Sequence, residues 1–269
     1  MAKFTFGFLG CGTMGGALAR AAAQALPGDR IAICDRHPEK TMDLTGCGKA
    51  VLADAVTVAA ESEYIFLGVK PQVMDVLFTQ IRAALQSRQD RFVLVSMAAA
   101  ISMERIEAFA GLSCPIIRIM PNTPTSVGEG MILYAVNSAV TDGDLAGFLA
   151  GMAKAGVADR IPEKMIDGAG CVSGCGPAFV CLFAEALADA GVECGVPRAK
   201  AQLYAAQTLL GTAKLLLESG QHPGQLKDAV CSPGGTTIAG VHALERNGFR
   251  AAVMDAVTAA KEKTDKMKK

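Results

Sequence analysis

The chain has 269 residues, of which 51% are hydrophobic and 19% are charged, so it holds enough apolar surface for one large or two ordinary domains. This composition excludes a disordered or fibrous protein. The 26 basic and 26 acidic side chains leave a formal net charge of zero. Because a neutral chain has no field that draws it onto phosphate backbones or anionic lipid, we expect no nucleic-acid partner.

We expect a cytoplasmic chain with neither a membrane span nor a secretory leader. The longest charge-free stretch, residues 168–184, is interrupted by four glycines and Pro177, and residues 1–10 lead directly into a strand pattern and a glycine loop. The nine cysteines form no C-x-x-C pair and lie among apolar neighbours, which predicts buried free thiols. The three histidines share no ligand spacing with them, so no metal site is predicted.

The first part of the chain, residues 1–161, alternates short β-rich runs with helical runs. Buried strands are predicted at residues 4–9, 31–34, 64–69, 92–96 and 116–120, with helices at 14–26, 73–85 and 102–109. Two further strands at 131–135 and 157–161 flank a helix near 142–155. This βαβ rhythm predicts an α/β domain with a doubly wound parallel sheet of the Rossmann type, covered by helices on both faces.

The second part, residues 162–269, shows no strand signal, and its helices follow one another between glycines and prolines. One apolar stripe contains Leu182 and Leu187, and a second contains Leu203, Leu210 and Leu217. Their helical spacing predicts that both stripes face a core. We expect a helical domain this apolar to bury part of its surface in a partner subunit, most commonly in a symmetric dimer.

A G-x-G-x-x-G sequence follows the first predicted strand and opens a helix. It consists of Gly10, Cys11, Gly12, Thr13, Met14 and Gly15, and the second strand ends in the acid Asp35. The first glycine permits the tight turn, the second lets a pyrophosphate approach the backbone, and the third allows close packing of helix on sheet. N–H groups at the helix start then bind the anion. The pattern predicts a dinucleotide site.

The residues leave the choice of dinucleotide open. Asp35 is suited to accept hydrogen bonds from an adenosine ribose, which favours NAD. The adjacent Arg36 is suited to pair with a 2′-phosphate, which favours NADP. The expected cofactor is therefore NADP or NAD.

Three further loops follow predicted strands, at the edge where open α/β sheets bind ligands. They contribute candidate cofactor contacts: Gly68, Val69, Lys70 and Pro71 in the first loop, Ala98 and Ala99 in the second, and Asn122 in the third. The small residues leave room for a flat ring. Lys70 fits a surface lysine equally well, and the Asn122 loop, which lies between two prolines, also fits a rigid structural turn.

A candidate anion pocket lies in residues 222–240. A helix is predicted to end near residue 231, a hard turn runs from Ser232 to Gly235, and a new helix starts at Thr236 and Thr237. That start offers unpaired N–H groups, two hydroxyls and a positive dipole end without a side-chain cation, which suits a small carboxylate. Ordinary helix capping is the alternative. A second glycine turn, residues 173–178, suits either an opposite wall of the pocket or close packing of helices.

Together these segments resemble the pyrroline-5-carboxylate reductase family, whose members carry out the last step of proline biosynthesis. The resemblance runs from the glycine loop through residues 69–71, 118–124 and 173–179 to residues 222–240, the family's most distinctive segment. It implies hydride transfer from NADPH or NADH to the C=N bond of 1-pyrroline-5-carboxylate, giving L-proline. It also implies that residues 162–269 form an all-helical, substrate-binding dimerisation domain, in a homodimer or an assembly of several dimers.

The resemblance assigns roles residue by residue. Ser232, Thr236 and Thr237, beside Gly235, match positions that hold the substrate carboxylate and the region of the ring nitrogen, and residues 68–71 match a loop that contacts the cofactor. Thr237 is the candidate catalytic residue, with its hydroxyl near the ring nitrogen. Because an imine nitrogen can already be protonated near neutral pH, positioning and charge complementarity can supply most of the catalysis without a buried acid.

The chain departs from the family pattern at three positions. Gly170 stands where a threonine is expected near the substrate, Cys175 where serine is usual, and Gly220 where some members carry an acid. An acid at position 220 is therefore not an essential catalyst here.

Two other functions are compatible with this two-domain plan. A β-hydroxyacid dehydrogenase carries a catalytic lysine soon after its glycine turn, but here no lysine follows Gly176 until Lys200. A non-catalytic dinucleotide sensor would have little use for a carboxylate pocket, which is the feature that separates it from the reductase.

Overall fold

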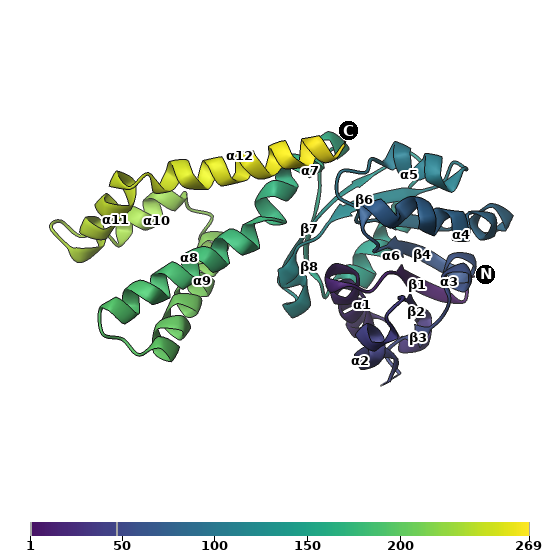
Figure 1. Ribbon diagram of the computed structural model, residues 1–269, viewed down its shortest axis with the longest axis horizontal. Coiled ribbons are helices and arrows are strands. Elements are labelled where there is room, and N and C mark those ends of the chain that lie inside the picture. Colours follow the sequence, from purple (N-terminus) through teal and green to yellow (C-terminus); the bar gives the residue numbers. More distant parts are fainter. Residues whose placement is uncertain (1, 47, 269) are drawn as a thin grey trace. The chain divides into compact units, whose positions relative to one another are not determined.

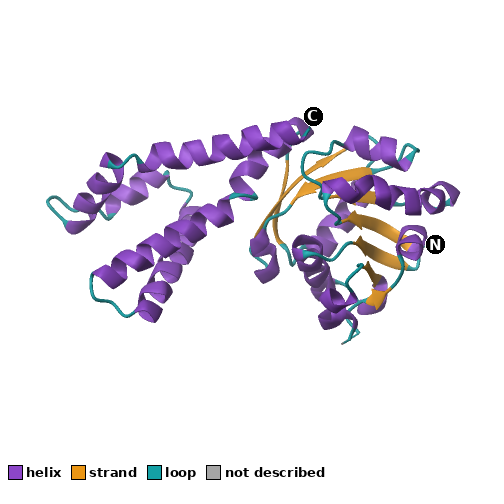
Figure 2. Ribbon diagram, viewed as in Figure 1, coloured by secondary structure: helices purple, strands orange, loops and turns teal. Residues whose placement is uncertain are grey.

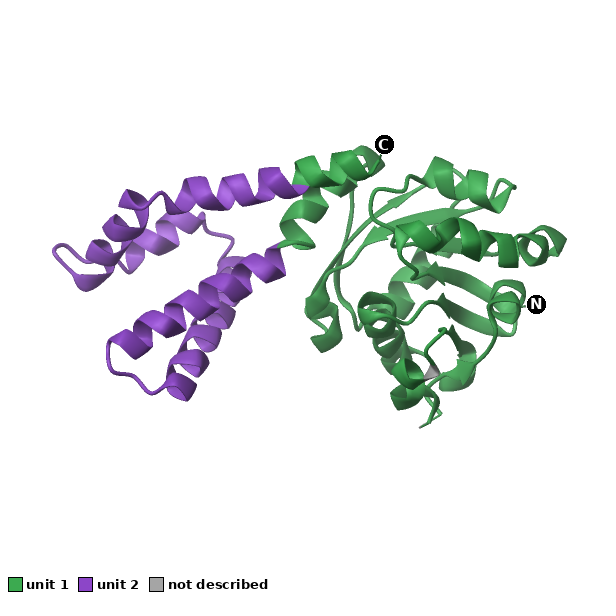
Figure 3. Cartoon of the chain, viewed as in Figure 1, with its two compact units in different colours: residues 1–175, 261–269 green, residues 176–260 purple. Residues whose placement is uncertain are grey.

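The computed structural model describes residues 2–46 and 48–268, without the side chain of Pro38. It contains two compact units, which Figure 3 colours separately. The sheet unit comprises residues 1–175 and 261–269, and the helical unit comprises residues 176–260. Residues within each unit contact one another, but these contacts do not show which residues share a function. The predicted division into a dinucleotide-binding domain, residues 1–161, and a substrate-binding domain, residues 162–269, therefore stays a prediction.

An eight-stranded sheet forms the centre of the sheet unit (Figure 1; Figure 2). The strand order is β3-β2-β1-β4-β5-β6-β7-β8, which places β1 beside β4 at a topological switch point. The predicted bounds of β1, β2 and β6 agree with the structure, and the α/β fold class is confirmed. The strands are β1 (Phe4–Leu9), β2 (Ile31–Cys34), β3 (Val51–Leu52), β4 (Ser62–Leu67), β5 (Val93–Ser96), β6 (Ile116–Met120), β7 (Gly130–Val136) and β8 (Gly156–Arg160).

The sheet is not parallel throughout, so that part of the prediction is wrong. β7 runs antiparallel to β6, with Arg118 opposite Ala135, whereas the other neighbouring pairs among the described strands are parallel. Residues 121–129, which include the 3-10 turn η4 (Thr123–Val127), are too few for the crossover that a parallel pair needs. The helix between β7 and β8 then makes those two strands parallel to each other.

Helices cover both faces of the sheet, as the doubly wound prediction requires. Side chains of α3, α4 and α5 pack on one face, and those of α1, α2 and α6 pack on the other. β1 serves both cores, because the successive residues Phe8 and Leu9 belong to the second and the first core. The helices that lie wholly in the sheet unit are α1 (Thr13–Ala25), α2 (Met42–Thr45), α3 (Ala55–Glu61), α4 (Met74–Ser87), α5 (Met103–Ala110), α6 (Asp142–Met152) and α7 (Glu163–Ser173).

An ion pair holds the amino end of α6. Arg91 donates from Nη2 to Oδ2 of Asp144 at 2.5 Å and from Nε to Oδ1 at 2.9 Å, and Asp144 also closes a capping box with Thr141. The hydrogen bonds from Arg91 lower the pKa of Asp144 to about 2. This carboxylate therefore stays ionised in moderately acidic solution.

We expect the free energy of unfolding to fall below about pH 5, in part through Asp144. Because its folded-state pKa lies below the ordinary value of 3.8, the carboxylate stabilises the fold above that value, and the stabilisation is lost as pH falls through the folded pKa. Urea unfolding at about pH 6 and about pH 2.5 measures the effect. Asp144→Asn should lose less stability between the two pH values than the unchanged chain, and an identical loss would contradict the assignment.

The helical unit has little core of its own. It contains α8 (Gly176–Glu193), α9 (Arg198–Ser219), α10 (Pro223–Ala229), α11 (Thr236–Arg246) and the first part of α12 (Phe249–Met267). Small residues make the contact between α8 and α9, where Ala188, Ala201 and Ala205 are buried. The predicted apolar stripes do not face a core within the chain, since Leu210 and Leu217 are 61% and 85% exposed. That prediction is wrong for a single chain.

The eight cysteines within the described residues are free thiols, and Cys47 lies outside those residues. Cys11, Cys114 and Cys171 are buried, as predicted. Cys34, Cys175 and Cys231 are half-buried and Cys181 and Cys194 are exposed, so the prediction of burial is wrong for these five.

Candidate functional site

Three glycines fix the place where β1 and β4 meet the start of α1. A Cβ atom at Gly15 or at Gly68 would lie closer than 3.0 Å to the carbonyl oxygen of Gly10, a separation that real Cβ atoms essentially never show. Gly10 has a φ of +98°, which favours glycine. The carbonyl of Gly10 is therefore enclosed between two other glycines, at the carboxyl ends of adjacent parallel strands.

The start of α1 leaves backbone donors free for an anion. Within the described residues the N–H groups of Gly12, Thr13 and Met14 have no protein acceptor, and the first donation is from Gly16 to the carbonyl of Gly12 at 2.8 Å. A Cβ atom at Gly12 would meet nothing within 4 Å, so the space beside these donors is open. A pyrophosphate group fits such a cradle.

Asp35 and Arg36, at the end of β2, differ in their surroundings. The carboxylate of Asp35 accepts the N–H of Cys11 at 2.7 Å and the N–H of His37 at 2.9 Å. Arg36 is exposed, and its side chain has no partner among the residues that the structure describes. Cys11 is buried, and this burial, followed by the charge of Asp35, raises the pKa of its thiol to about 12. The thiol therefore stays protonated at neutral pH.

The loops after β4 and β5 end at the same edge of the sheet as the glycine loop, because β1, β4 and β5 are parallel. Val69 and Pro71 are half-buried, whereas Lys70 is exposed and precedes the 3-10 turn η3 (Pro71–Val73). After β5, Ala98 is buried and Ala99 is half-buried. The next residue, Ala100, has a φ of +62°, a left-handed conformation that is uncommon for alanine.

Asn122 joins the loop after β6 to α7. Its Nδ2 donates to the carbonyl of Ser173 at 3.0 Å, and its Oδ1 accepts the N–H of Met131 at 2.8 Å. Because backbone groups engage both ends of the amide, the geometry favours the structural-turn interpretation. A cofactor contact by Asn122 stays a prediction.

A cluster of four charged residues beside this loop was missed by the sequence analysis. Arg118 is 3% exposed and donates to Asp167 at 2.5 Å and to Glu163 at 3.3 Å, while Lys268 lies 2.8 Å from the other Asp167 oxygen. The cluster ties α7 and the end of α12 to β6. The sequence does contain a signal for this cluster, since Arg118 is the one charged residue in the apolar run 116–120. A charge buried in a strand requires a partner of opposite charge.

In the helical unit, α11 begins with unpaired donors. Its N-cap is Gly235, and the N–H groups of Thr236, Thr237 and Ile238 have no acceptor among the described residues. Gly234, with a φ of +69°, turns the chain so that the hydroxyl of Ser232 lies over Gly235. The hydroxyls of Ser232, Thr236 and Thr237 are exposed and make no hydrogen bond within the described chain. The four predicted substrate residues thus lie at one helix start.

The three departures from the family pattern have structural contexts. A Cβ atom at Gly170 would lie 3.0 Å from Cγ of Met120, so glycine lets α7 approach the end of β6. The N–H groups of Gly174 and Cys175 both donate to the carbonyl of Gly170, which closes α7. Gly220 ends α9 with a φ of +61°, where an acidic side chain would be strained.

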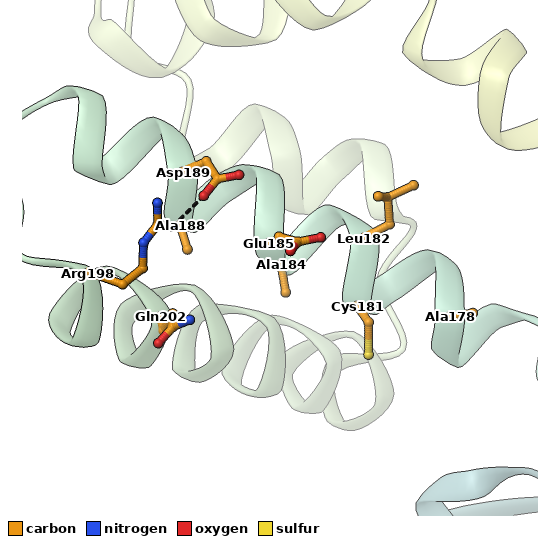
Figure 4. Close-up of a pocket in the computed structure, with 9 residues that line it drawn as sticks. All are labelled: Ala178, Cys181, Leu182, Ala184, Glu185, Ala188, Asp189, Arg198 and Gln202. Atoms are coloured by element: carbon orange, nitrogen blue, oxygen red, sulfur yellow. Dashed lines mark hydrogen bonds and ion pairs between the residues drawn. The ribbon is translucent and has the colours of Figure 1, made fainter.

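An open groove of about 930 Å³ lies between α8 and α9 (Figure 4). Small side chains such as Ala184 and Ala188 line it, and an ion pair joins Arg198 to Asp189. It contains none of the predicted site residues. Within the described residues, no group of three or more His, Cys, Asp or Glu side chains is arranged to hold a metal ion.

The fold and the glycine loop define the class of protein. A mostly parallel sheet with its glycine turn at the switch point and free donors at the start of α1 is a Rossmann-type dinucleotide-binding fold. A purely helical region follows it in the described chain.

Comparisons with known proteins narrow this class. Residues 163–267 match the family model described as pyrroline-5-carboxylate reductase dimerisation, and residues 5–100 match the model described as NADP oxidoreductase, coenzyme F420-dependent. The pyrroline-5-carboxylate reductase of Escherichia coli strain K12 is 43% identical over 267 residues, covering 98% of each chain. That of Pisum sativum is 38% identical and covers 97% of this chain and 95% of its own.

A solved structure extends the likeness to three dimensions. The crystal structure of Plasmodium falciparum pyrroline carboxylate reductase with NADP bound has a TM-score of 0.89 and 33% identity, with 100% of both chains covered. The chain belongs to the pyrroline-5-carboxylate reductase family. It is an NAD(P)-dependent oxidoreductase, and its residues 163–267 form the family's dimerisation region.

This assignment explains an apolar stretch that otherwise suggests a membrane. Residues Glu163–Glu193 are long and apolar enough to cross a bilayer by length and composition. They lie within the dimerisation region, and a turn at residues 174–175 divides them into α7 and α8. The stretch is therefore part of the dimerisation helices and not a membrane span.

Proposed function

We propose that this chain reduces 1-pyrroline-5-carboxylate to L-proline, with NADPH or NADH as the hydride donor. The observation that carries the proposal is the start of α11, where three N–H groups and three hydroxyls that have no partner among the described residues meet without a side-chain cation. A carboxylate suits these donors and the positive end of the helix dipole. Full-length identity to reductases supports the reaction class.

The sheet unit supplies the dinucleotide site. The backbone of residues 10–15 fits the pyrophosphate, since a Cβ at Gly12 would meet open space and the adjacent donors are free. Residues 68–71 and Ala98 and Ala99 border the nicotinamide end, and Asp35 and Arg36 border the adenosine end. The bound reduced nicotinamide supplies a hydride to the imine carbon, and the imine nitrogen carries the balancing proton.

Thr237 is the candidate catalytic residue. Its hydroxyl is exposed at the second position of α11 and has no partner within the described chain, so it is available to the ring nitrogen directly or through a water molecule. Ser232, Gly235 and Thr236 hold the carboxylate on the same helix start. Holding the ring in one orientation supplies most of the rate, because the protonated imine needs no strong acid.

Replacing Thr237 with alanine is expected to lower kcat/KM for the imine by about tenfold to a hundredfold, the range for one hydrogen bond to a charged group. Steady-state kinetics with saturating nucleotide measure it. Thr212→Ala, on α9, is a control that removes a threonine hydroxyl outside the proposed site. Unchanged turnover and unchanged imine affinity in Thr237→Ala would remove Thr237 from the site.

One experiment tests reaction class and cofactor together. The chain should oxidise L-proline at alkaline pH with NADP or NAD, which the absorbance of the reduced nicotinamide reports. Calorimetry separates this function from a dinucleotide sensor, because proline or a ring analogue should bind the nucleotide-loaded protein. Nucleotide binding with no proline oxidation and no response to proline would favour the sensor.

The active assembly is a homodimer, or several dimers, in the cytoplasm. Large apolar residues remain exposed on α8 and α9, among them Leu182, Leu203 and Leu210, and a second copy is the partner that would cover them. The free thiols of the described cysteines suit a reducing compartment. Sedimentation equilibrium should give twice the chain mass or an even multiple, and a monomer would contradict the assembly.

A further inference from the structure

Asp35 is bonded to two separate backbone segments. Its Oδ2 accepts the N–H of Cys11, the residue directly after Gly10, at 2.7 Å. Its Oδ1 accepts the N–H of His37, in the turn after β2, at 2.9 Å. Gly10 N–H also donates to the carbonyl of Cys34 at 2.8 Å, so the glycine loop and the end of β2 are joined twice.

These contacts give Asp35 a role besides reading a ribose, because the two backbone N–H groups occupy two of the roughly four acceptor sites of its carboxylate. An acid that reads a ribose offers its oxygens to the ribose hydroxyls. Here each oxygen already accepts a short backbone hydrogen bond, and hydrogen bonds to an ionised acceptor are about twice as strong as neutral ones. One of the two donors comes from the glycine loop itself, so the position of that loop depends on the carboxylate.

Arg36 is the available cation next to Asp35 in this turn. It lies between Asp35 and His37, it is exposed, and its side chain has no partner within residues 2–46 and 48–268. The neighbouring imidazole of His37 lies 3.2 Å from the carboxylate of Glu39. A guanidinium on a turn whose backbone is held by Asp35 can present its fork of donors to a phosphate.

We propose that Asp35 is a positioning residue, whose carboxylate sets the glycine loop for either nucleotide, while Arg36 discriminates NADPH from NADH. The inference rests on the dinucleotide site of the proposed function and gives Asp35 and Arg36 separate roles in that site. It predicts that the nucleotide preference does not depend on Asp35, although the identity of an acid at that position would by itself favour NAD.

The test is the binding of three reduced nucleotides to Asp35→Asn, followed by nicotinamide fluorescence. NADPH, NADH and reduced nicotinamide mononucleotide are used, because the last has no adenosine and therefore no adenosine ribose. Asparagine keeps the shape but loses one acceptor, so the dissociation constants of all three should rise by a similar factor, about tenfold. Arg36→Ala should weaken NADPH more than NADH.

If Asp35 instead bound the adenosine ribose, the affinities of the Asp35→Asn variant for the three nucleotides would change differently. If Asp35→Asn weakened NADH several times more than NADPH and left the mononucleotide unchanged, Asp35 would be reading the ribose and the proposal would be wrong. Equal losses of NADPH and NADH in Arg36→Ala would refute the phosphate contact. Nucleotide titration needs no imine, so a failure of the proposed reaction leaves this test intact, whereas wild-type protein that bound none of the three would overturn both.

Two variants control for folding. Asp54→Asn changes a carboxylate that likewise accepts a backbone N–H, from Thr57 at 2.8 Å, but at the N-cap of α3. It should leave all three dissociation constants unchanged. That result would show that the loss of a carboxylate–backbone hydrogen bond elsewhere in the fold does not weaken nucleotide binding. If Asp35→Asn fails to fold, Asp35→Ser keeps a hydroxyl acceptor, and the same ratio among the three nucleotides decides the question.

Discussion

Alanine in place of Gly68 should weaken nucleotide binding by about a hundredfold. The new Cβ would overlap the carbonyl of Gly10, and because both groups are backbone, the clash cannot be relieved by a side-chain rotation. The ends of β1 and β4 must separate, and a displacement of about 1 Å in a binding loop is enough to cost roughly that factor. Fluorescence titration with NADPH measures the loss.

Two other glycine substitutions make this result interpretable. Gly143→Ala, on α6, adds a methyl group that meets only Thr141 Oγ1 at 3.8 Å, so it should bind nucleotide normally. Gly12→Ala meets no protein atom within 4 Å, yet it should also bind poorly, because its methyl group would occupy space meant for the pyrophosphate. Normal nucleotide affinity in Gly68→Ala would show that the enclosed carbonyl does not shape the site.

Replacing Arg118 with methionine should lower the free energy of unfolding by about 3–5 kcal/mol. The change removes the guanidinium from Asp167, which is buried, and from Glu163. Lys268 remains beside Asp167 but is 43% exposed, so it cannot replace a buried partner fully. Urea unfolding measures the loss.

Two control variants distinguish the loss of a buried ion pair from the loss of an exposed one. Lys268→Met should cost less than about 1 kcal/mol, the usual value of a solvent-exposed ion pair. The double variant Arg118→Met with Asp167→Leu should recover part of the stability, because an apolar pair leaves no buried charge unpaired. A loss in Arg118→Met as small as that in Lys268→Met would contradict a structural role for the cluster.

The sequence predicts buried parallel strands well because they are short, continuous apolar runs. β1, β2 and β6 therefore have the predicted bounds. β3 was missed because it has only two residues, both exposed, and α3 because seven residues carry a weak periodic signal. The antiparallel direction of β7 follows from the length of the preceding connection, which a strand pattern by itself does not report.

In the candidate site, too, features set by consecutive residues can be predicted from the sequence, whereas contacts between distant residues cannot. Glycine spacing and the helix start at Thr236 can be read locally, because each depends on a few consecutive residues. The partners of Asp35, Asn122 and Arg118 are set by long-range packing, so a residue type alone does not predict them. Likewise, helical spacing marks an apolar stripe but does not tell whether the chain or a second copy covers it.

The dependence of catalysis on the substrate carboxylate tests the central claim most directly. Initial rates with NADPH are compared for 1-pyrroline-5-carboxylate and for 1-pyrroline, which has the same C=N bond but no carboxylate. If the donors at the start of α11 hold that group, kcat/KM for 1-pyrroline should be lower by about a hundredfold or more, since donors left without their acceptor carry a penalty of that order. Equal kcat/KM values for the two imines would contradict the account.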